Sequence, residues 1–256
     1  MFSVKRPPFK SACVYYTRPI RKVQSEQNSY ADNSCNEANM TTDRIETDTS
    51  HRVSTWLLYF AFFLTFGVLY VCTAQSGPAW QDSGIYQDRI LNFELGTSRG
   101  IALAHPLMIL LGKAFSYLPF GTIFWRMNLV SALAGAVAVA NVAVFVKRVQ
   151  PGRLLPAIIA GLTFGFAHTI WWLSTICESQ MLNVALLTLN LNLLLGLYRR
   201  PDGVLAMLIG LVAGLGAATH DLALLSLPSV GLMVLWLCAS RRLSWRGVGL
   251  VVIGWL

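Results

Sequence analysis

Two carboxylates in the apolar part of this chain stand out as candidates for acid–base chemistry. Asp82 lies in the stretch W-Q-D-S-G-I-Y, and Glu178 follows the apolar run T-I-W-W-L-S-T-I-C. A carboxylate can act as a general base, bind a metal ion or accept hydrogen bonds from the hydroxyl groups of a sugar. Each also has a structural explanation, because Asp82 could close a turn with Ser83 and Gly84, and Glu178 could face a helix dipole.

Basic and aromatic side chains form a second group of candidates. His105 precedes a proline, His220 is followed by Asp221, Arg126 opens a long apolar segment, and Trp172 ends a Trp-Trp pair. Arginine suits phosphate recognition, and an aromatic ring can stack on a sugar. The structural alternatives are a solvated turn for the His-Asp pair and interfacial anchoring for the arginine and the indole.

The composition determines what kind of protein holds these residues. Of the 256 residues, 55% are hydrophobic and 12% are charged, whereas about 25% are charged in an average soluble domain. The mean hydropathy is +0.54. The chain has no P-loop, no Gly-rich dinucleotide motif, no H-E-x-x-H and no G-x-S-x-G. We therefore predict an all-α, polytopic membrane protein that binds the lipid bilayer and no nucleic acid.

The first 52 residues differ from the remainder. They hold eight Lys or Arg and six Asp or Glu, with no apolar run. We interpret 1–52 as a polar, disordered cytoplasmic tail and 53–256 as the transmembrane domain. Met40 is a candidate for the true start, which the detection of peptides from 1–39 by mass spectrometry would contradict. The five cysteines form no C-x-x-C pair and are interpreted as small apolar residues rather than disulfide or metal ligands.

Six apolar segments have the length and composition expected of a membrane span. A seventh, 247–256, stops part way, so we expect the chain to be C-terminally incomplete. Gly161-x-x-x-Gly165 and Gly210-x-x-x-Gly214 are spacings that allow helices to approach closely, and we predict a packing role for both. The six segments are 56–74, 127–146, 154–173, 180–198, 204–219 and 222–239.

The apolar stretch 101–118 is assigned from the distribution of basic residues, which collect in cytoplasmic loops. Basic clusters at 147–153, 199–200 and 241–246 follow every second span. All three fall on the same side as a cytoplasmic N-terminus only if 101–118 does not cross. We therefore predict a juxtamembrane or re-entrant helix there, on the outer side. The candidate carboxylates and histidines then share the outer face.

Several short motifs, taken in order, resemble a known family. They are D-S-G (82–84), A-H-P (104–106), L-L-G-K (110–113), L-P-F-G (118–121), R-M-N-L-V-S-A (126–132), the W-W…E run (171–178) and G-L-G-A-A-T-H (214–220). Together they resemble the bacterial membrane proteins related to protein O-mannosyltransferase-like transmembrane proteins, within the GT-C glycosyltransferases. The resemblance covers about 56–240. It departs from the family pattern beside the anchors, where Ile85 replaces a glutamate and Ser179 a valine.

The resemblance implies a fold and a reaction. The chain would be the N-terminal part of a GT-C bundle, in the bacterial inner membrane or, in a eukaryote, the endoplasmic reticulum membrane. It would transfer a sugar from a polyprenyl-phosphate donor to a protein or envelope glycan on the non-cytoplasmic side. A divalent metal is a candidate cofactor, because GT-C members differ in using one. Asp82 would be the general base and Glu178 a second catalytic residue, with His105, Arg126, Trp172, His220 and Asp221 binding the donor.

Two alternatives remain open at this point. A transporter or flippase of lipid-linked precursors would need polar residues at mid-membrane depth and broken helices in paired halves. The spans are nearly free of charge at that depth, which argues against it. An inactive membrane scaffold of the same fold is the other alternative, since the residues beside Asp82 and Glu178 have drifted from the family pattern.

Overall fold

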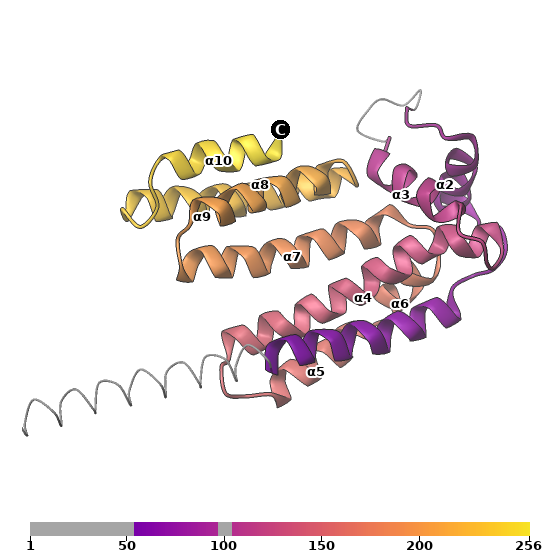
Figure 1. Ribbon diagram of the computed structural model, residues 1–256, viewed down its shortest axis with the longest axis horizontal. Coiled ribbons are helices and arrows are strands. Elements are labelled where there is room, and N and C mark those ends of the chain that lie inside the picture. Colours follow the sequence, from indigo (N-terminus) through magenta and orange to yellow (C-terminus); the bar gives the residue numbers. More distant parts are fainter. Residues whose placement is uncertain (1–53, 97–103) are drawn as a thin grey trace, which may run out of the picture. The chain divides into compact units, whose positions relative to one another are not determined.

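The computed structural model describes residues 54–96 and 104–256, and within these ranges the only regular elements are helices (Figure 1). The predicted all-α fold is confirmed for this part of the chain. The predictions for the tail 1–52, including the start at Met40 and the state of Cys13 and Cys35, lie outside the described residues.

The helices follow one another with short connections. A helix over Ser54–Thr73 comes first, and the later elements keep the labels of Figure 1. They are α2 (Gln81–Asn92), α3 (Pro106–Ser116), α4 (Ile123–Val149), α5 (Leu155–Gly165), α6 (His168–Thr175), α7 (Ser179–Arg199), α8 (Gly203–Ala217), the 3-10 helix η2 (Asp221–Ser226), α9 (Leu227–Ala239) and α10 (Arg246–Trp255).

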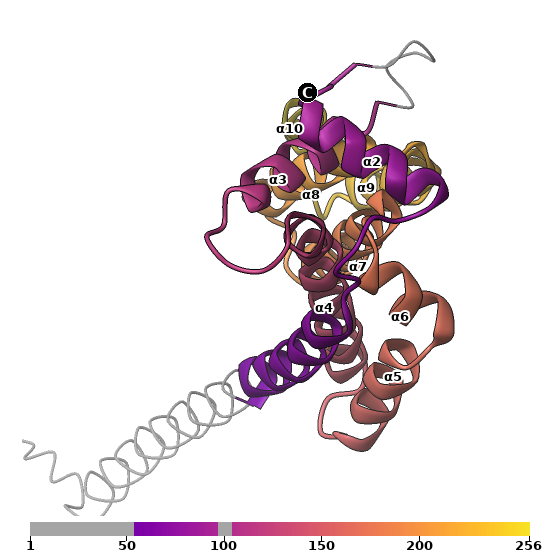
Figure 2. The same ribbon diagram turned by 90° about the vertical axis from the view of Figure 1, so that its right-hand side faces the viewer.

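Four helical segments of the described chain are long and apolar enough to cross a membrane, which supports the predicted membrane protein. They are Ser54–Thr73, α4, α7 and the continuous η2–α9 segment Asp221–Ala239. The predicted single span over 154–173 is instead a bent pair, because α5 and α6 meet at 58° (Figure 2). The hydroxyl of Tyr70 donates a 2.6 Å hydrogen bond to the carbonyl oxygen of Gly165 at this break. In a continuous helix the carbonyl oxygen of Gly165 would accept from a backbone N–H one turn further on, but here it accepts from Tyr70.

Two further segments are too short to cross as straight helices. The predicted span 204–219 is α8, whose 15 residues extend about 22 Å, against roughly 30 Å of hydrocarbon. The stretch 101–118 contributes the 11-residue α3, about 16 Å long. A short α3 agrees with the prediction that 101–118 does not span, whereas the membrane side on which it lies stays a prediction.

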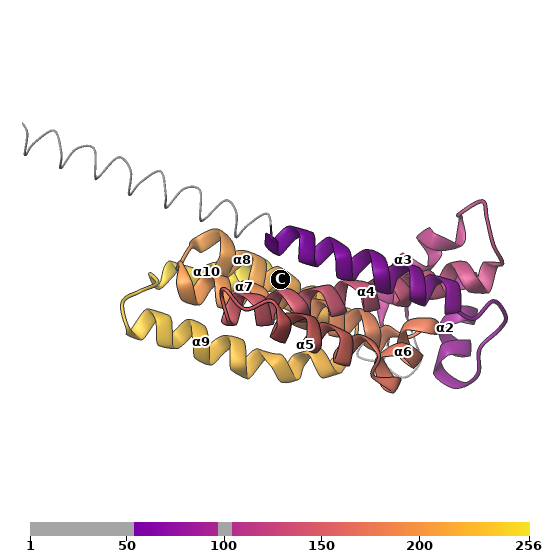
Figure 3. The ribbon, with the colours of Figure 1, turned by 90° about the horizontal axis from the view of Figure 1, so that it is seen from below.

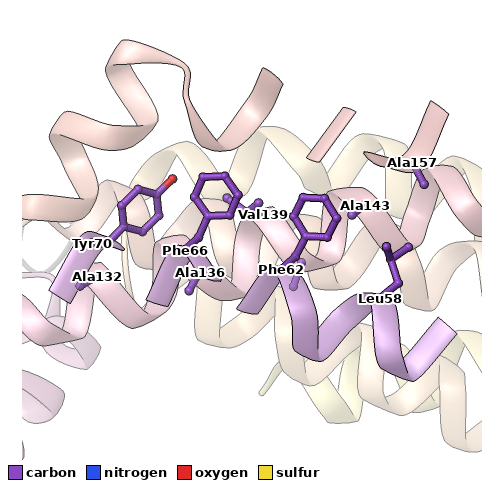
Figure 4. Packing of buried hydrophobic residues seen from close by; sticks show 10 residues of the cluster. Leu58, Phe62, Phe66, Tyr70, Ala132, Ala136, Val139, Ala143 and Ala157 are labelled. Carbon is purple, nitrogen blue, oxygen red and sulfur yellow. The ribbon is translucent and has the colours of Figure 1, made fainter. Parts of the chain in front are cut away.

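The glycine spacings pack helices together, as predicted. Phe62 and Phe66 of the first helix belong to a buried cluster that includes alanines of α4 (Figure 4). A Cβ at Gly161 or Gly165 would lie only 2.4 or 2.3 Å from the rings of Phe62 and Phe66, respectively. Gly210 of α8 likewise leaves room for the backbone of α10, because a Cβ there would lie 2.0 Å from a carbonyl oxygen.

The long helices place two chemically different ends at opposite poles of the described bundle. We call the first the α2–α3 end, where those helices lie beside the beginnings of α4 and α7 (Figures 1 and 3). We call the second the basic end, where α4, α7 and α9 finish at Lys147–Arg148, Arg199 and Arg241–Arg242. The alternation predicted from the basic clusters is therefore present in the fold.

Candidate functional site

The candidate site lies at the α2–α3 end and begins with the first turn of α2. Asp82 is exposed there, and the next residue, Ser83, is buried. The hydroxyl of Ser83 donates a hydrogen bond of 2.5 Å to Oε1 of Glu178. Asp82 thus offers an accessible carboxylate, while the neighbouring Ser83 holds the buried carboxyl group of Glu178.

Glu178 is fixed through both its backbone and its side chain. It precedes α7 as the N-cap, and its N–H donates to Oγ of Ser131 at 2.9 Å. The same hydroxyl lies 3.2 Å from the carbonyl oxygen of Glu178. Burial raises the pKa of the Glu178 carboxyl above its ordinary value; the hydrogen bond from Ser83 lowers it and the charge of Asp82 raises it. Glu178 therefore holds a proton more readily than an exposed glutamate.

Tyr86 connects this carboxylate pair to the histidines. Its hydroxyl lies 3.1 Å from the hydroxyl of Ser179, and its ring meets the ring of His105 edge-on at a centroid distance of 5.3 Å. Burial raises the pKa of Tyr86, and the charges of Glu178 and Asp82 raise it further. The phenol stays protonated near neutral pH and can donate a hydrogen bond.

His105 and His220 come together from distant segments, with their ring centroids 5.1 Å apart. Nδ1 of His105 lies 2.7 Å from the carbonyl oxygen of Thr219, so it must carry the proton, and Nε2 of the neutral ring is an acceptor. Nδ1 of His220 accepts from the N–H of Leu222 at 3.1 Å, which leaves the proton on Nε2. The pair therefore offers one acceptor and one donor nitrogen.

The backbone at His105 is held in an unusual conformation. Its φ of 48° and ψ of 49° are left-handed, although the next residue is Pro106, which begins α3. Residues other than glycine rarely adopt this backbone conformation, and strain of this kind persists only where neighbouring contacts fix it. The contact with Thr219 and the 3.1 Å hydrogen bond from the N–H of Leu107 to the carbonyl oxygen of Ala218 do so. These contacts orient the His105 ring towards His220.

The electrostatic surroundings keep His220 uncharged at neutral pH. Burial lowers its pKa first, the neighbouring His105 lowers it further, and Asp221 opposes both effects. Asp221 begins η2 and is partly exposed. A negatively charged ligand placed against the ring of His220 would favour its protonation.

Two predicted site residues lie apart from this cluster. The guanidinium of Arg126 donates to the carbonyl oxygens of Ser116, at 2.8 Å, and of Leu118. These carbonyls are at the end of α3 opposite to His105, so Arg126 fastens α3 to α4. Trp172 of α6 is 57% exposed, and among the described residues it makes no ring contact with the aromatic residues of the site. The structure therefore brings together Asp82, Glu178, His105, His220 and Asp221 and leaves these two outside.

Sequence reasoning missed the uncharged members of the cluster. Ser83 and Tyr86 lie three positions apart on α2, and Gln87 joins them on its buried face. Gln87 donates from Nε2 to Oδ1 of Asn128 at 3.2 Å, which anchors α2 to α4. The sequence contains one indication of this group, because Ser83, Tyr86 and Gln87 have the i, i+3, i+4 spacing that places residues on one face of a helix. Within residues 54–96 and 104–256, no group of three or more His, Cys, Asp or Glu side chains is placed to hold a metal ion.

Comparison with known proteins identifies a family that the chain matches. The family model described as "Protein O-mannosyl-transferase TMEM260 N-terminal domain" matches residues 100–243, more than half of the chain. The match includes His105, Glu178 and His220, whereas Asp82 and the rest of α2 precede it. Neither the curated proteins nor the solved structures yielded a match.

Proposed function

Because the chain belongs to the family of the protein O-mannosyl-transferase TMEM260 N-terminal domain, we propose that it is a membrane glycosyltransferase. The donor would be a mannose linked to a polyprenyl phosphate, and the acceptor a hydroxyl group of a protein on the non-cytoplasmic side. The family description supports the sugar and the protein acceptor over an envelope glycan. The observation that carries the proposal is the pairing of an exposed carboxylate, Asp82, with the buried carboxyl of Glu178.

The carboxyl groups of Asp82 and Glu178 have different roles in the proposed reaction. Asp82 accepts the proton of the acceptor hydroxyl while that oxygen forms a bond to the anomeric carbon, with inversion. The bond from the anomeric carbon to the donor phosphate breaks, and the phosphate leaves with the electron pair. Glu178 is held too firmly by Ser83 and Ser131 to follow the substrate, so it suits a hydrogen bond to a sugar hydroxyl.

The histidine pair would receive the phosphate. Nε2–H of His220 is a donor, and the ring of His105 lies beside it with the centroids 5.1 Å apart. Donors aimed at the leaving phosphate stabilise the charge that it gains in the transition state. No strong general acid is needed, because the leaving group is already a phosphate.

A lipid donor is supported by the cavity next to the histidines. It has a volume of about 480 Å³ and lies among α7, α8, η2 and α9. Leucine is the most frequent residue in its lining, and Leu222, Leu225 and Leu191 are among those exposed on the outside of the helices. Because η2 begins directly after His220, a polyprenyl chain in this cavity would continue from a phosphate held at the rings.

The membrane orientation is part of the proposal. The candidate site and the basic residues lie at opposite ends of the long helices. If the basic end is cytoplasmic, the site faces the lumen of the endoplasmic reticulum or, in a bacterium, the outer side of the inner membrane. The N-terminus is then cytoplasmic.

The test compares two aspartates of α2. Asp82→Asn should lower mannosyl transfer from a polyprenyl-phosphate mannose to an acceptor peptide in proteoliposomes by about 10²–10⁴-fold, the usual contribution of a general base. Asp88→Asn is the matched control, because Asp88 is exposed on the same helix and accepts a 3.2 Å hydrogen bond from Asn92, one helical turn away. Unchanged transfer by Asp82→Asn would rule out its role, and equal losses in both variants would point to a structural defect.

The bend between α5 and α6 favours a second candidate, a flippase of lipid-linked precursors, because transporters use broken helices. A flippase would move a fluorescent polyprenyl-phosphate sugar between leaflets of a vesicle in the absence of any acceptor. Such movement without transfer to a peptide would favour the flippase over the transferase.

A further inference from the structure

The basic end carries far more positive than negative charge. Asp202 is its one acidic residue among those described, and none of the basic side chains there forms an ion pair within the described chain. The basic residues are Lys147, Arg148, Arg153, Arg199, Arg200, Arg241, Arg242 and Arg246. Within the described residues, this end of the bundle therefore has Asp202 as its one acidic counter-charge.

Three of these arginines, which we call the arginine cluster, gather around the last turn of α7. Arg148 of α4 donates from Nη1 to the carbonyl oxygen and to Oδ1 of Asn192, at 2.8 and 3.1 Å. Arg199 donates to the carbonyl oxygen of Arg148. Arg242, from the α9–α10 connection, donates to the carbonyl oxygen of Tyr198 at 2.8 Å. Three separate segments thus bring guanidinium groups to the C-terminal part of α7.

Capping of helix ends explains only part of this arrangement. Cations near the last carbonyls of a helix are favourable. Each guanidinium has five N–H donors, however, and only one nitrogen of each arginine in the cluster is engaged in the bonds described above. Holding the like charges of Arg148 and Arg199 together costs free energy unless an anion lies beside them. The remaining donors of Arg199 and Arg242 are on exposed side chains.

The aromatic residues beside the cluster indicate where that anion comes from. The rings of Tyr198 and Trp236 stack at 5.9 Å, and the guanidinium of Arg242 lies 5.2 Å from the centre of the Tyr198 ring. Both rings are exposed on the outside of membrane-crossing helices, at 43% and 49%. Tyr and Trp in such positions mark the level of the lipid headgroups. A ligand at this level is a lipid rather than a solute.

We propose that the arginine cluster binds the phosphate headgroup of an anionic phospholipid. The planar guanidinium groups of Arg199 and Arg242 donate to the phosphate oxygens, and Arg148 supplies a third positive charge from the α4–α7 interface. The acyl chains run along the exposed apolar surfaces of α7 and α9. The bound lipid joins the ends of α4, α7 and α9, and this site does not depend on the proposed enzymatic activity.

The test uses two triple variants of equal charge in the full chain. Arg148→Gln with Arg199→Gln and Arg242→Gln removes the cluster. Arg153→Gln with Arg200→Gln and Arg246→Gln removes three other cations of the same end. The protein, purified in a neutral detergent, is titrated with phosphatidylglycerol or with phosphatidylcholine, and binding is followed by native mass spectrometry and by the thermal unfolding temperature.

Wild type should bind phosphatidylglycerol over phosphatidylcholine and unfold at a higher temperature in its presence. Loss of the cluster should weaken phosphatidylglycerol binding by about a hundredfold, since three cations at the headgroup level are removed. The control triple should weaken it at least tenfold less. The single variant Arg199→Gln, at an exposed position, should show a several-fold loss even if the triple variant does not fold.

Several results would overturn the proposal. Equal losses in both triple variants would show a diffuse surface charge, not a site. Equal binding of the two lipids by wild type would contradict the requirement for an anion. Stabilisation by inorganic phosphate to the same extent as by phosphatidylglycerol, at equal concentrations, would replace the lipid with a soluble anion.

Discussion

The hydroxyl of Ser83 donates a 2.5 Å hydrogen bond to Oε1 of Glu178, a residue 95 positions further along the chain. The bond joins α2 to the N-cap of α7 in a buried position. It also counteracts the effect of burial on the pKa of Glu178, because a donor favours the charged carboxylate. This single contact therefore links the placement of α2, and with it Asp82, to the protonation of Glu178.

Ser83→Ala should destabilise the protein more at pH 7 than at pH 4. The pKa of Glu178 is raised in the folded state, so its stabilising contribution is complete below the ordinary value of 4.5 and is lost as the pH rises through the folded-state pKa. Without the Ser83 donor the pKa rises further and the loss grows. The hydrogen bond contributes about 1.5–3 kcal/mol when Glu178 is charged and about 0.5–1.5 kcal/mol when it is neutral.

Thermal unfolding in detergent at the two pH values measures this difference. The control is Ser83→Ala in a Glu178→Gln background, where the cost should no longer change with pH. An equal cost of Ser83→Ala at pH 4 and pH 7 in the wild-type background would contradict the assigned effect on Glu178.

His220→Gln should reduce the loss of stability in mild acid. The pKa of His220 is lowered by burial and by His105, so protonation disfavours the folded state. Its stabilising contribution is present above the ordinary value of 6.5 and is lost as the pH falls through the lower folded-state pKa. Unfolding temperatures between pH 7.5 and pH 5 would show the effect. His168→Gln is the control, because His168 is exposed on α6 and should keep the wild-type acid sensitivity.

Much of the fold followed from hydropathy and the positions of basic residues. Those two patterns placed the long helices and predicted that Asp82, His105, Glu178 and His220 would share one end, and the structure brings these four residues together. The prediction was possible because each span reverses the direction of the chain. Arg126 was assigned to the same site from its residue type, its place at the start of a span and the family resemblance, and its bonds to the end of α3 show that these were insufficient.

The remaining features depend on contacts that no local pattern encodes. The stretch 154–173 is predominantly apolar and contains no proline after 156, so hydropathy predicts a single helix. At its break, the hydroxyl of Tyr70 from another helix donates to the carbonyl oxygen of Gly165. Ser83 and Tyr86 are common residue types, and only the packing of α2 on α7 shows that they contact Glu178 and Ser179. Such pairings arise from tertiary structure alone.

Gly210→Ala should destabilise the contact between α8 and α10. The added Cβ would lie 2.0 Å from the carbonyl oxygen of Val251, which belongs to a helix backbone and cannot move independently. Overpacking of this kind costs about 1–3 kcal/mol. Gly231→Ala on α9 is the control, because nothing lies within 4 Å of its Cβ position and alanine favours a helix by about 1 kcal/mol. Unfolding temperatures that fall equally in both variants would contradict the packing role of Gly210.

Two asparagines of the bundle should respond in opposite directions to replacement by leucine, whose side chain has the same number and branching of heavy atoms. Asn141 of α4 donates to Oγ1 of Thr188 at 3.2 Å, so Asn141→Leu should cost about 0.6–2 kcal/mol, the range for such bonds between membrane helices. Asn190 of α7 is 3% exposed, and its Oδ1 has no hydrogen-bond partner in the described chain. Asn190→Leu removes that unsatisfied acceptor, so it should leave the stability unchanged or raise it. Free energies of unfolding measured in bicelles would distinguish the two variants, and a large destabilisation by Asn190→Leu would show that its amide has a partner in the membrane.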